Sequence, residues 1–302
     1  MTDDIGISIA DVDPHLLRTF VAVAETGSFS AAAQRLRYTQ SAVSQQIAAL
    51  EADLGTALLT RRPVALTTAG ERLHRHANLI LVRLEAARAD VTRAIAPPGR
   101  LILGLTPLAW SEPVSAALAR IRGDSARLRS HVLVDGRDRI VTAAATGEID
   151  LALVDGFTAP NDPLRLPEPG AQVAVGVAGS PAVVAVPDRH PLARRAALDL
   201  NDLADAYWID APMVAPFSRL PVDGLRAGLR YEGADVTVLT GLVAAGHGLI
   251  VLPAPLVERR PGLTGVPIAA PRLVHRVELL RTPNDEEPAG RLAALLGAQP
   301  LQ

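Results

Sequence analysis

The stretch RLRYTQSAVSQQIAALEADLG, residues 35–55, places apolar and small polar side chains on different sides of one expected helix. Its apolar residues recur at helical spacing, at Val43, Ile47, Leu50 and Leu54. Its other face carries short polar side chains, at Gln40, Ser41, Ser44 and Gln45. Charged residues such as lysine and glutamate are the usual choice for a helix face that meets only solvent. The glutamines and serines therefore raise the question of what this face binds.

The composition limits the class of protein. The chain has 302 residues, 49% of them hydrophobic, which favours about two or three folded domains over disorder. It contains no cysteine, which excludes disulfides, thiol catalysis and cysteine-ligated metal. The acidic N-terminal sequence MTDDIGISIADVDPH has no apolar signal-peptide region, and no apolar run is long enough to span a membrane. We expect a cytoplasmic protein.

The charge is spread unevenly along the chain. The formal net charge is −2, which by itself gives no indication of nucleic acid. Residues 34–75, however, hold six arginines against three acidic residues. The surroundings of the helix are therefore basic, and Arg61 and Arg62 follow it closely in the sequence.

Residues 13–67 predict a small helical domain with a hairpin. One helix is expected over residues 14–25, and a second over FSAAAQRL, capped by Ser28 or Ser30. The third is the helix described above, with Thr39 as its cap. Two helices joined by so short a turn are typical of a helix-turn-helix, and LLTRRPVALT predicts a small β wing after it.

Residues 68–96 predict one long helix. A coiled-coil seam follows it at alternating spacings of three and four residues, at Leu73, Ala77, Ile80, Leu84, Ala87 and Val91. We interpret this seam as a dimerisation surface; a helix packed on its own domain is the alternative. Pro97-Pro98-Gly99 ends the helix and predicts a hinge at residues 97–99.

Residues 100–302 alternate between strands and helices. RLILGLT, RSHVLVD and EIDLALV predict strands separated by the helices PVSAALARIR and DRIVTAAATG, a rhythm typical of a parallel α/β sheet. A second set begins with the strands QVAVGV and AVVAVP, the helix LNDLADA and the strand YWID. It continues with a helix near 218–230, the strand VTVLT, the helix GLVAAG and the strand LIVLP. VHRVELLR and the helix EEPAGRLAALLG return the chain to the first sheet.

These elements predict two α/β lobes with a cleft between them. Lobe I is expected over residues 100–158 and 267–302, and lobe II over residues 159–266. Ligand groups in such a fold come from strand ends and helix N-termini, which gives the candidates Thr106, Trp110, Asp135, Asp155, Ala211, Met213 and Thr240.

Each of these candidates has an alternative role as a capping or turn residue. Trp110 could equally lie in the core, and Arg219 could equally be a surface residue. The acidic side chains near the cleft favour a cationic or amine-bearing effector over a carboxylate.

The side chains of the third helix are suited to DNA. Glutamine pairs bidentately with adenine, and serine can bond either a base or a phosphate. Short side chains let the helix approach the groove, and a helix N-terminus favours phosphate. A solvated polar face is the alternative; the tight turn before the helix and the arginines after it favour DNA.

At this point a family resemblance becomes clear. LLRTFVAVAETGSFSAAAQRLRYTQSAVSQQIAALEADLGTALLTR closely resembles the N-terminal domain of LysR-type transcriptional regulators. GEIDLALV, VVAVPDRHPLA and GLVAAGHGLIVLP extend the resemblance over nearly the whole chain. It implies a winged helix-turn-helix, a linker helix that pairs two subunits, and a two-lobed effector domain like periplasmic solute-binding proteins. It also implies a dimer of dimers, that is, a homotetramer, with a small co-inducer between the lobes.

The resemblance places the family's DNA contacts on the face already described, at Thr39, Gln40, Ser41, Ser44 and Gln45. Ser41 stands where the family often has proline, and Gln45 stands where it often has a basic residue. The wing TRRPVALT is shorter than is usual, and its candidates for DNA contact are Arg61 and Arg62.

The sequence thus predicts a transcriptional regulator with a DNA-binding domain over residues 1–67, a linker helix over 68–96 and an effector domain over 100–302. The expected partners are double-stranded operator DNA, a small-molecule effector, further copies of the chain and, as a possible addition, RNA polymerase; no membrane contact is expected. A solute-binding protein of a transport system is the alternative. No catalytic constellation, cofactor motif or metal site is present, so we do not expect an enzyme.

Overall fold

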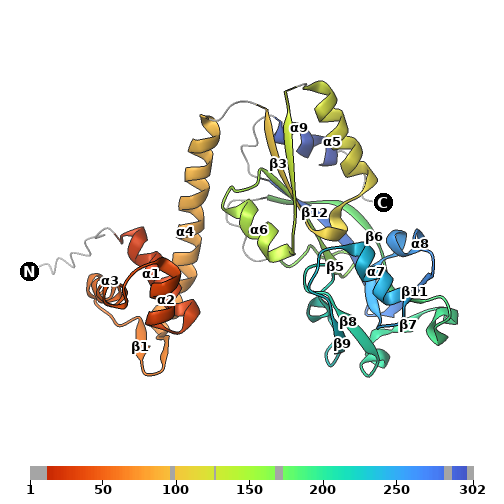
Figure 1. Cartoon of the computed structure of the whole chain (residues 1–302), viewed down its shortest axis with the longest axis horizontal. Coiled ribbons are helices and arrows are strands. Elements are labelled where there is room, and N and C mark those ends of the chain that lie inside the picture. The colour runs from red at the N-terminus through yellow and green to blue at the C-terminus, as the bar shows by residue number, and fades with distance from the viewer. Residues whose placement is uncertain (1–11, 96–98, 126, 167–172, 282–287, 298–302) are drawn as a thin grey trace, which may run out of the picture. The chain divides into compact units, whose positions relative to one another are not determined.

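The computed structural model describes residues 12–95, 99–125, 127–166, 173–281 and 288–297 (Figure 1). The chain divides into two compact units, Met1–Arg88 and Ala89–Gln302. The division falls inside the long helix α4, Thr68–Ala94, so the last turn of that helix belongs to the second unit. None of the described helices is long and apolar enough to cross a membrane.

The first unit is a winged helix-turn-helix. Its elements are α1 (Pro14–Thr26), α2 (Phe29–Leu36), α3 (Gln40–Asp53), the antiparallel hairpin of β1 (Leu59–Arg61) and β2 (Val64–Leu66), and most of α4. A side-chain oxygen caps each of the first three helices: Asp13 bonds the amide of His15, Ser28 that of Ala31, and Thr39 that of Ala42. The capping prediction for the second helix is settled in favour of Ser28.

The N-terminal half of α4 packs on its own unit. Ala77 is fully buried there, and Leu73 packs against the same core as Phe20 and Ile47. Ala77 therefore packs inside its own unit, as the alternative interpretation of this helix expects, and Leu73 contacts the same core while it stays partly exposed. Ile80 and Val91, farther along the helix, are 46% and 67% exposed.

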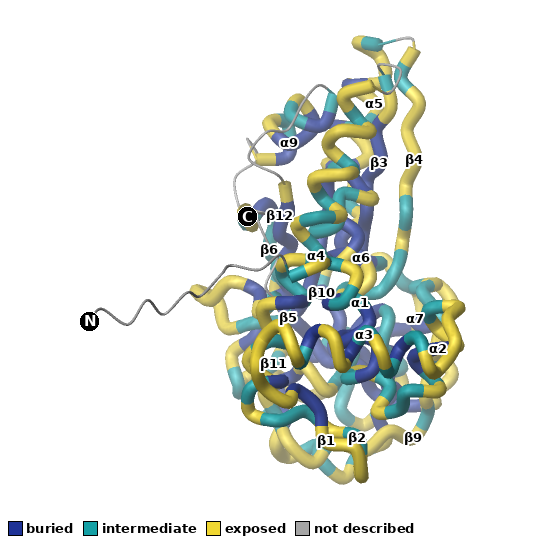
Figure 2. Tube along the Cα trace, turned by 90° about the vertical axis from the view of Figure 1, so that its left-hand side faces the viewer, coloured by how far each residue is buried: buried dark blue, intermediate teal, exposed yellow. Residues whose placement is uncertain are grey.

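Lobe I of the second unit has a mixed sheet covered on both faces. The parallel strands are β4 (Arg129–Val134), β3 (Arg100–Leu105) and β5 (Leu151–Thr158), and β12 (Val274–Arg281) pairs with β5 in the antiparallel sense. Helices α5 (Glu112–Asp124) and α9 (Ala289–Gly297) cover one face, and α6 (Arg137–Ala145) covers the other. Figure 2 shows the central strands buried and the edge strand β4 exposed along most of its length.

Lobe II is joined to lobe I through one long strand, β6 (Val173–Pro187). The first part of β6 pairs with β12 in lobe I, and its last part pairs with β11 (Leu263–Ala270) and β10 (Ile250–Pro253) in lobe II. Helices α7 (Val236–Ala244) and α8 (Ala254–Glu258) pack on this part of the sheet. The remaining strands are β7 (Leu198–Asp199) beside β11 and the parallel pair β8 (Tyr207–Asp210) and β9 (Arg226–Arg230).

The structure corrects several predictions about the strands of this unit. QVAVGV and AVVAVP are parts of one strand, β6, and the sheet is mixed rather than parallel. The first part of β6 lies in lobe I, whereas β11 extends lobe II to Ala270, so the boundary predicted at residue 267 comes later in the chain.

Three helix and strand assignments are also wrong. VTVLT is the first half of helix α7, because Asp235 caps the amides of Thr237 and Val238. The helix expected near 218–230 is instead the short 3-10 helix η4 (Phe217–Arg219) followed by strand β9. LNDLADA forms only the 3-10 turn η3 (Leu200–Leu203). The predicted hinge residues Pro97 and Pro98 and the start of the last predicted helix lie outside the described residues.

Candidate functional site

The polar face of α3 is exposed and preformed. The side chains of Gln40, Ser41 and Gln45 are exposed and Ser44 is half-buried, while Val43, Ile47 and Leu50 are buried on the other side. Neither Gln45 nor Gln40 makes a side-chain hydrogen bond within the described part of the chain. Thr39 caps the helix and its hydroxyl lies 3.0 Å from that of Ser41.

The neighbouring glutamine has a different role. Gln46 Oε1 accepts a hydrogen bond of 2.6 Å from the hydroxyl of Thr19 on α1, a buried residue. Gln46 therefore fastens α3 to α1, whereas Gln45 is free to meet a partner. The two adjacent glutamines thus lie on different sides of α3: Gln46 on the side that packs against α1 and Gln45 on the exposed side.

The wing is attached to α3 through Glu51. One oxygen of Glu51 accepts from the amides of Leu58 and Leu59 at 2.9 and 3.2 Å, and the other lies 3.3 Å from Nη2 of Arg61. The Arg61 guanidinium also lies 5.0 Å from the ring centroid of Phe29. Arg61 is thus engaged within its own unit, while Arg62 is exposed and makes no ion pair with another described residue.

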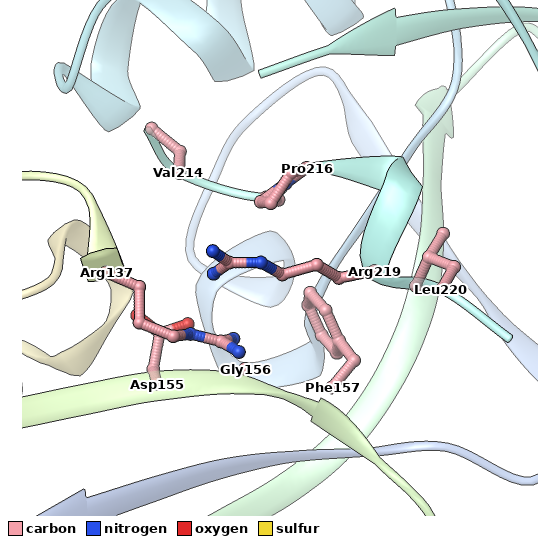
Figure 3. A pocket seen from close by; sticks show the side chains of 9 residues that line it. Arg137, Asp155, Gly156, Phe157, Val214, Pro216, Arg219 and Leu220 are labelled. Carbon is pink, nitrogen blue, oxygen red and sulfur yellow. The ribbon is translucent and has the colours of Figure 1, made fainter. Parts of the chain in front are cut away.

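A second polar site lies between the lobes of the other unit (Figure 3). Lobe I contributes Arg137, Asp155, Gly156 and Phe157, and lobe II contributes the segment 214–220, including Arg219. The hollow has an empty volume of about 240 Å³, part of it open to solvent. The part of this volume that can hold a water molecule is only about 10 Å³. That is enough for about one water molecule, far below the several hundred Å³ of a typical ligand pocket.

A buried polar network forms the lobe I wall of this hollow. The hydroxyl of Thr106 donates to Asp155 and accepts from the Asp155 amide at 2.8 Å. The second carboxylate oxygen of Asp155 lies 3.0 Å from Nε2 of His275, and all three residues are buried. The carboxylate of Asp155 is therefore already paired inside the protein.

Two arginines bring positive charge to the hollow, and both reach into it (Figure 3). Arg137 is the first residue of α6; its Nε is buried and has no hydrogen-bond partner. Burial, and then the nearby charge of Arg219, lower the pKa of Arg137 below its usual value. Arg219 donates to Asp138 of α6 at 2.7 Å, a salt bridge from lobe II to lobe I.

The predicted effector residues are only partly brought together. Asp155 lines the hollow and Thr106 supports it. Asp135 instead accepts from the amide of Gly136 at 2.7 Å, and Trp110 is 49% exposed at the end of η1 (Pro107–Ala109).

The three candidates from lobe II do not line the hollow. Ala211 is fully buried in the core of lobe II, and Met213 lies beside Gly136 without lining the hollow. Thr240 does not line the hollow either, and its hydroxyl donates to the carbonyls of Val236 and Thr237 within its own helix.

Sequence reasoning missed Arg137, Gly156, Phe157 and His275, and it left Arg219 on the surface. The signal for Arg137 was available, because it follows the end of strand β4 and starts helix α6, the type of position from which the candidates were chosen. Gly156 and Phe157 continue β5 past the predicted Asp155. Nothing in the local sequence indicates that Arg219 meets them.

The order of these two sites along the chain matches two family models. Residues 14–71 match the bacterial regulatory helix-turn-helix protein of the lysR family, and residues 95–297 match the LysR substrate binding domain. The chain belongs to the LysR family. It is therefore a DNA-binding transcriptional regulator with an effector-binding domain, and neither a transport protein nor an enzyme.

Curated relatives of this LysR-family chain support the assignment. It is 31% identical to a probable hydrogen peroxide-inducible genes activator of Mycobacterium avium, over 94% of each chain. It is 33% identical to the HTH-type transcriptional regulator BudR of Raoultella terrigena, over 78% of this chain and 83% of that one. Among solved structures, full-length BenM is 26% identical with a TM-score of 0.50, covering 94% of this chain and 95% of BenM.

Proposed function

We propose that this LysR-family regulator reads its operator in the major groove through the exposed face of α3. Gln40 and Gln45 can each bond adenine bidentately, and Ser41 and Ser44 are short enough to let the helix approach the bases. The observation that carries the proposal is the contrast between the unbonded Gln45 and the adjacent Gln46, which Thr19 holds. The helix N-terminus, with its cap Thr39, faces phosphate in this arrangement.

The proposal includes a regulator confined to the cytoplasm and organised in the three parts named above, residues 1–67, 68–96 and 100–302. In the wing, Arg62 is the better candidate for a backbone contact, since Arg61 is paired with Glu51. Effector control is assigned to the hollow between the lobes, because charged groups from both lobes meet there and a ligand that changes their spacing changes the lobe arrangement.

DNA binding can be tested with the full-length protein and a fluorescent duplex taken from the region upstream of its own gene. We expect tighter binding to this duplex than to a scrambled duplex of the same composition, by about a thousandfold or more at physiological salt. Equal affinity for both duplexes at every salt concentration would contradict sequence-specific reading. The solute-binding alternative predicts no binding to either duplex.

We also propose that subunits pair through the distal part of α4 and assemble as a dimer of dimers. Ile80, Leu84, Ala87 and Val91 lie on the predicted seam and are not part of the buried core of the first unit. Leu84→Asp places a charge in the seam, so light scattering should give a smaller assembly and DNA affinity should fall about 100-fold. Arg83→Asp, one residue off the seam, is the control. A Leu84→Asp protein of unchanged mass would contradict the proposed interface.

A further inference from the structure

Arg137 carries a buried side-chain nitrogen that lacks a hydrogen-bond partner. Its Nε is buried without a hydrogen bond, and its guanidinium forms no ion pair with another described residue. Burial of this group is unfavourable because it gives up hydration, and the charges of Asp155, Asp138 and Glu278 offset that loss only in part. The lowered pKa of Arg137, due first to burial and then to Arg219, reflects the same situation.

The chain holds Arg137 in this position. A Cβ atom added at Gly156 would lie 1.8 Å from Nη2 of Arg137, so β5 passes directly beneath the guanidinium. Arg137 is also the first residue of α6, where the helix dipole adds positive potential. Gly156 thus leaves space for the guanidinium at one wall of the hollow, and the N-terminus of α6 adds positive potential at the same wall.

The carboxylates around Arg137 are occupied elsewhere. Asp155 is paired with Thr106 and His275, and Asp138 is paired with Arg219. Glu278 uses one oxygen to accept from the amide of Leu164 and from Arg276, each at 2.8 to 2.9 Å, and its other oxygen is buried without a partner. Of the acidic candidates that suggested a cationic effector, Asp155 is thus paired within the protein and Asp135 accepts from the amide of Gly136.

From these contacts we infer that the hollow binds a small organic carboxylate whose oxygens bridge Arg137 and Arg219. The inference rests on the proposed assignment of the hollow as the effector site. The carboxylate would take the place of Asp138 on Arg219, and both arginines would then bind it with charge-assisted hydrogen bonds. The rest of the lining is apolar, chiefly Phe157, Val214, Pro216 and Leu220, which favours a ligand with a compact apolar body over inorganic phosphate.

The small size of the hollow adds a mechanical consequence. A ligand larger than about one water molecule fits only if lobe II moves away from lobe I. Because the Arg219–Asp138 salt bridge joins the lobes, exchanging Asp138 for a ligand carboxylate releases one of the contacts that hold them together.

The test uses calorimetric titration of the full-length protein with isovalerate and isopentylamine, which share a branched apolar body and carry opposite charges. We expect isovalerate to bind and isopentylamine not to bind. Arg137→Gln should weaken isovalerate binding about 10- to 100-fold, as expected for loss of a charge-assisted hydrogen bond in a buried site. Arg139→Gln is the matched control, because Arg139 lies two residues along the same helix and pairs with Glu148 at the surface.

Several outcomes would overturn the inference. These are binding of the amine but not the acid, equal acid affinity in Arg137→Gln, binding of inorganic phosphate alone, and no binding of isovalerate at about 10 mM, where a millimolar ligand saturates its site. DNA anisotropy separates this inference from the proposed function. Isovalerate could bind in a way that depends on Arg137 and yet leave DNA affinity unchanged. In that case the carboxylate site would stand, and the assignment of effector control to the hollow would be wrong.

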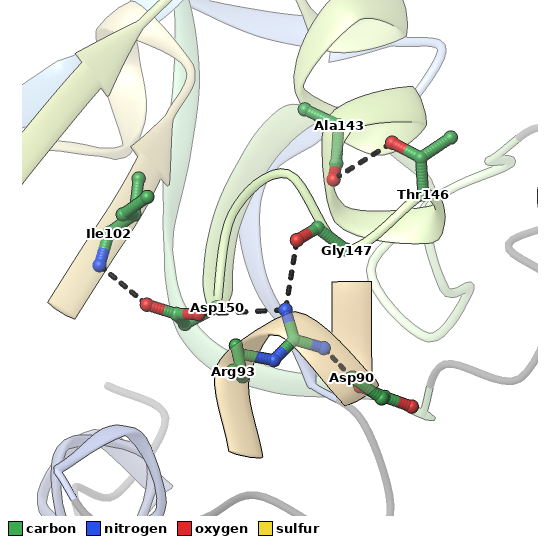
Figure 4. A network of polar contacts seen from close by, with 7 residues as sticks. All are labelled: Asp90, Arg93, Ile102, Ala143, Thr146, Gly147 and Asp150. Atoms are coloured by element: carbon green, nitrogen blue, oxygen red, sulfur yellow. Dashed lines mark hydrogen bonds and ion pairs between the residues drawn. The ribbon is translucent and has the colours of Figure 1, made fainter. Parts of the chain in front are cut away.

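A second inference comes from the last turn of α4, which belongs to the second unit (Figure 4). Nη1 of Arg93 donates to the carbonyl of Gly147 at 2.8 Å and lies 3.7 Å from Asp150, and Nη2 bonds Asp90. Asp150 in turn accepts from the amide of Ile102 in β3 at 2.7 Å. Arg93 therefore joins α4 to the turn between α6 and β5 and, through Asp150, to the sheet.

Gly147 makes this contact possible in two ways. Its φ is +73°, a conformation that favours glycine, and a Cβ there would lie 2.7 Å from the Cβ of Ala89. The geometry points to Arg93 as a positioning residue that docks the end of α4, residues 89–94, on the GEID segment, residues 147–150. Helix α6 then connects the hollow, at Arg137, to the docking turn that follows its other end.

Hydrogen exchange in the full-length protein tests the docking without any ligand. Arg93→Ala should speed amide exchange in residues 89–94 about tenfold, as expected from loss of about one charge-assisted hydrogen bond, with little change in α5 or α9. Arg230→Ala, which removes ion pairs with Asp210 and Glu232 in lobe II, should leave residues 89–94 unchanged. Gly147→Ala should have the same effect as Arg93→Ala. Gly246→Ala is its control, because φ is +82° there and the space around it is open, so this variant introduces backbone strain without a steric clash. Unchanged exchange in both Arg93→Ala and Gly147→Ala would overturn the docking role.

Discussion

The face of α3 and the hollow between the lobes are built in opposite ways. The α3 face comes from one short helix, its polar side chains are exposed, and the groups that position it lie on the buried side. The hollow is assembled from β5, α6 and the segment 214–220, and its carboxylates are already paired with protein groups. A preformed surface suits a rigid partner such as duplex DNA. A nearly closed hollow suits a ligand that must rearrange the protein in order to enter.

The strongest way to break this comparison is to disturb the support of α3 alone. Ile47 is fully buried beneath the α3 face, and Ile47→Ala should destabilise the first unit by about 2–5 kcal/mol. Calorimetry should show an earlier first transition and loss of DNA binding. Titration with isovalerate should be unchanged. If ligand binding were lost as well, the two sites would not be separately supported.

A smaller effect is expected from the α3 face itself. Gln45→Ala should weaken binding to the upstream duplex by about 1–3 kcal/mol and leave binding to a scrambled duplex nearly unchanged. Gln46→Ala is the comparison variant, since it removes the hydrogen bond to Thr19 and should lower the melting temperature instead. Equal losses on both duplexes for Gln45→Ala would indicate a phosphate contact.

The hollow can be altered with a single methyl group. Gly156→Ala forces the Arg137 guanidinium aside and should weaken carboxylate binding about tenfold. Gly123→Ala in α5, where a Cβ meets no atom within 4 Å, provides the control and should leave binding unchanged. Carboxylate affinity that survives Gly156→Ala would show that Arg137 does not contact the ligand.

The smallest effect distinguishes the two arginines of the wing. Arg61→Ala should lower the stability of the first unit by about 0–1 kcal/mol, the range of an exposed ion pair, with little change in the salt dependence of DNA binding. Arg62→Ala should weaken binding to all duplexes and reduce the salt slope by about one. The reverse assignment would mean that Arg61 leaves Glu51 when DNA binds.

The same contrast explains what could be predicted from the sequence. The α3 face depends on helical spacing and on the cap Thr39, which are local features, so its residues were found directly. The hollow depends on contacts between residues far apart in the chain, such as Arg219 with Asp138, and spacing does not encode these contacts. The rule that ligand groups come from strand ends and helix N-termini located Asp155, and it also covers Arg137, the first residue of α6, which was not chosen.

The errors in secondary structure have a similar origin. VTVLT has the β-branched composition of a strand, yet it is helical because Asp235 caps it and its apolar residues pack in the core of lobe II. The expected helix near 218–230 is interrupted by Pro221 and Gly224, and the chain after them pairs with β8. The first case shows tertiary packing overriding local propensity, whereas in the second the local helix breakers were present in the sequence.

The continuity of β6 bears on how far the lobes can move. One strand carries hydrogen bonds to β12 in one lobe and to β10 and β11 in the other, so neither lobe can swing about a slack connection. Displacement has to be absorbed as a change of twist along a hydrogen-bonded ladder, in which neighbouring strands are rotated by about 20 to 25° on average and by about 10 to 35° at the extremes. The sheet therefore acts as an elastic element with a restoring force. Opening of the hollow by a ligand would strain this ladder, and the strain would favour return to the closed form when the ligand leaves.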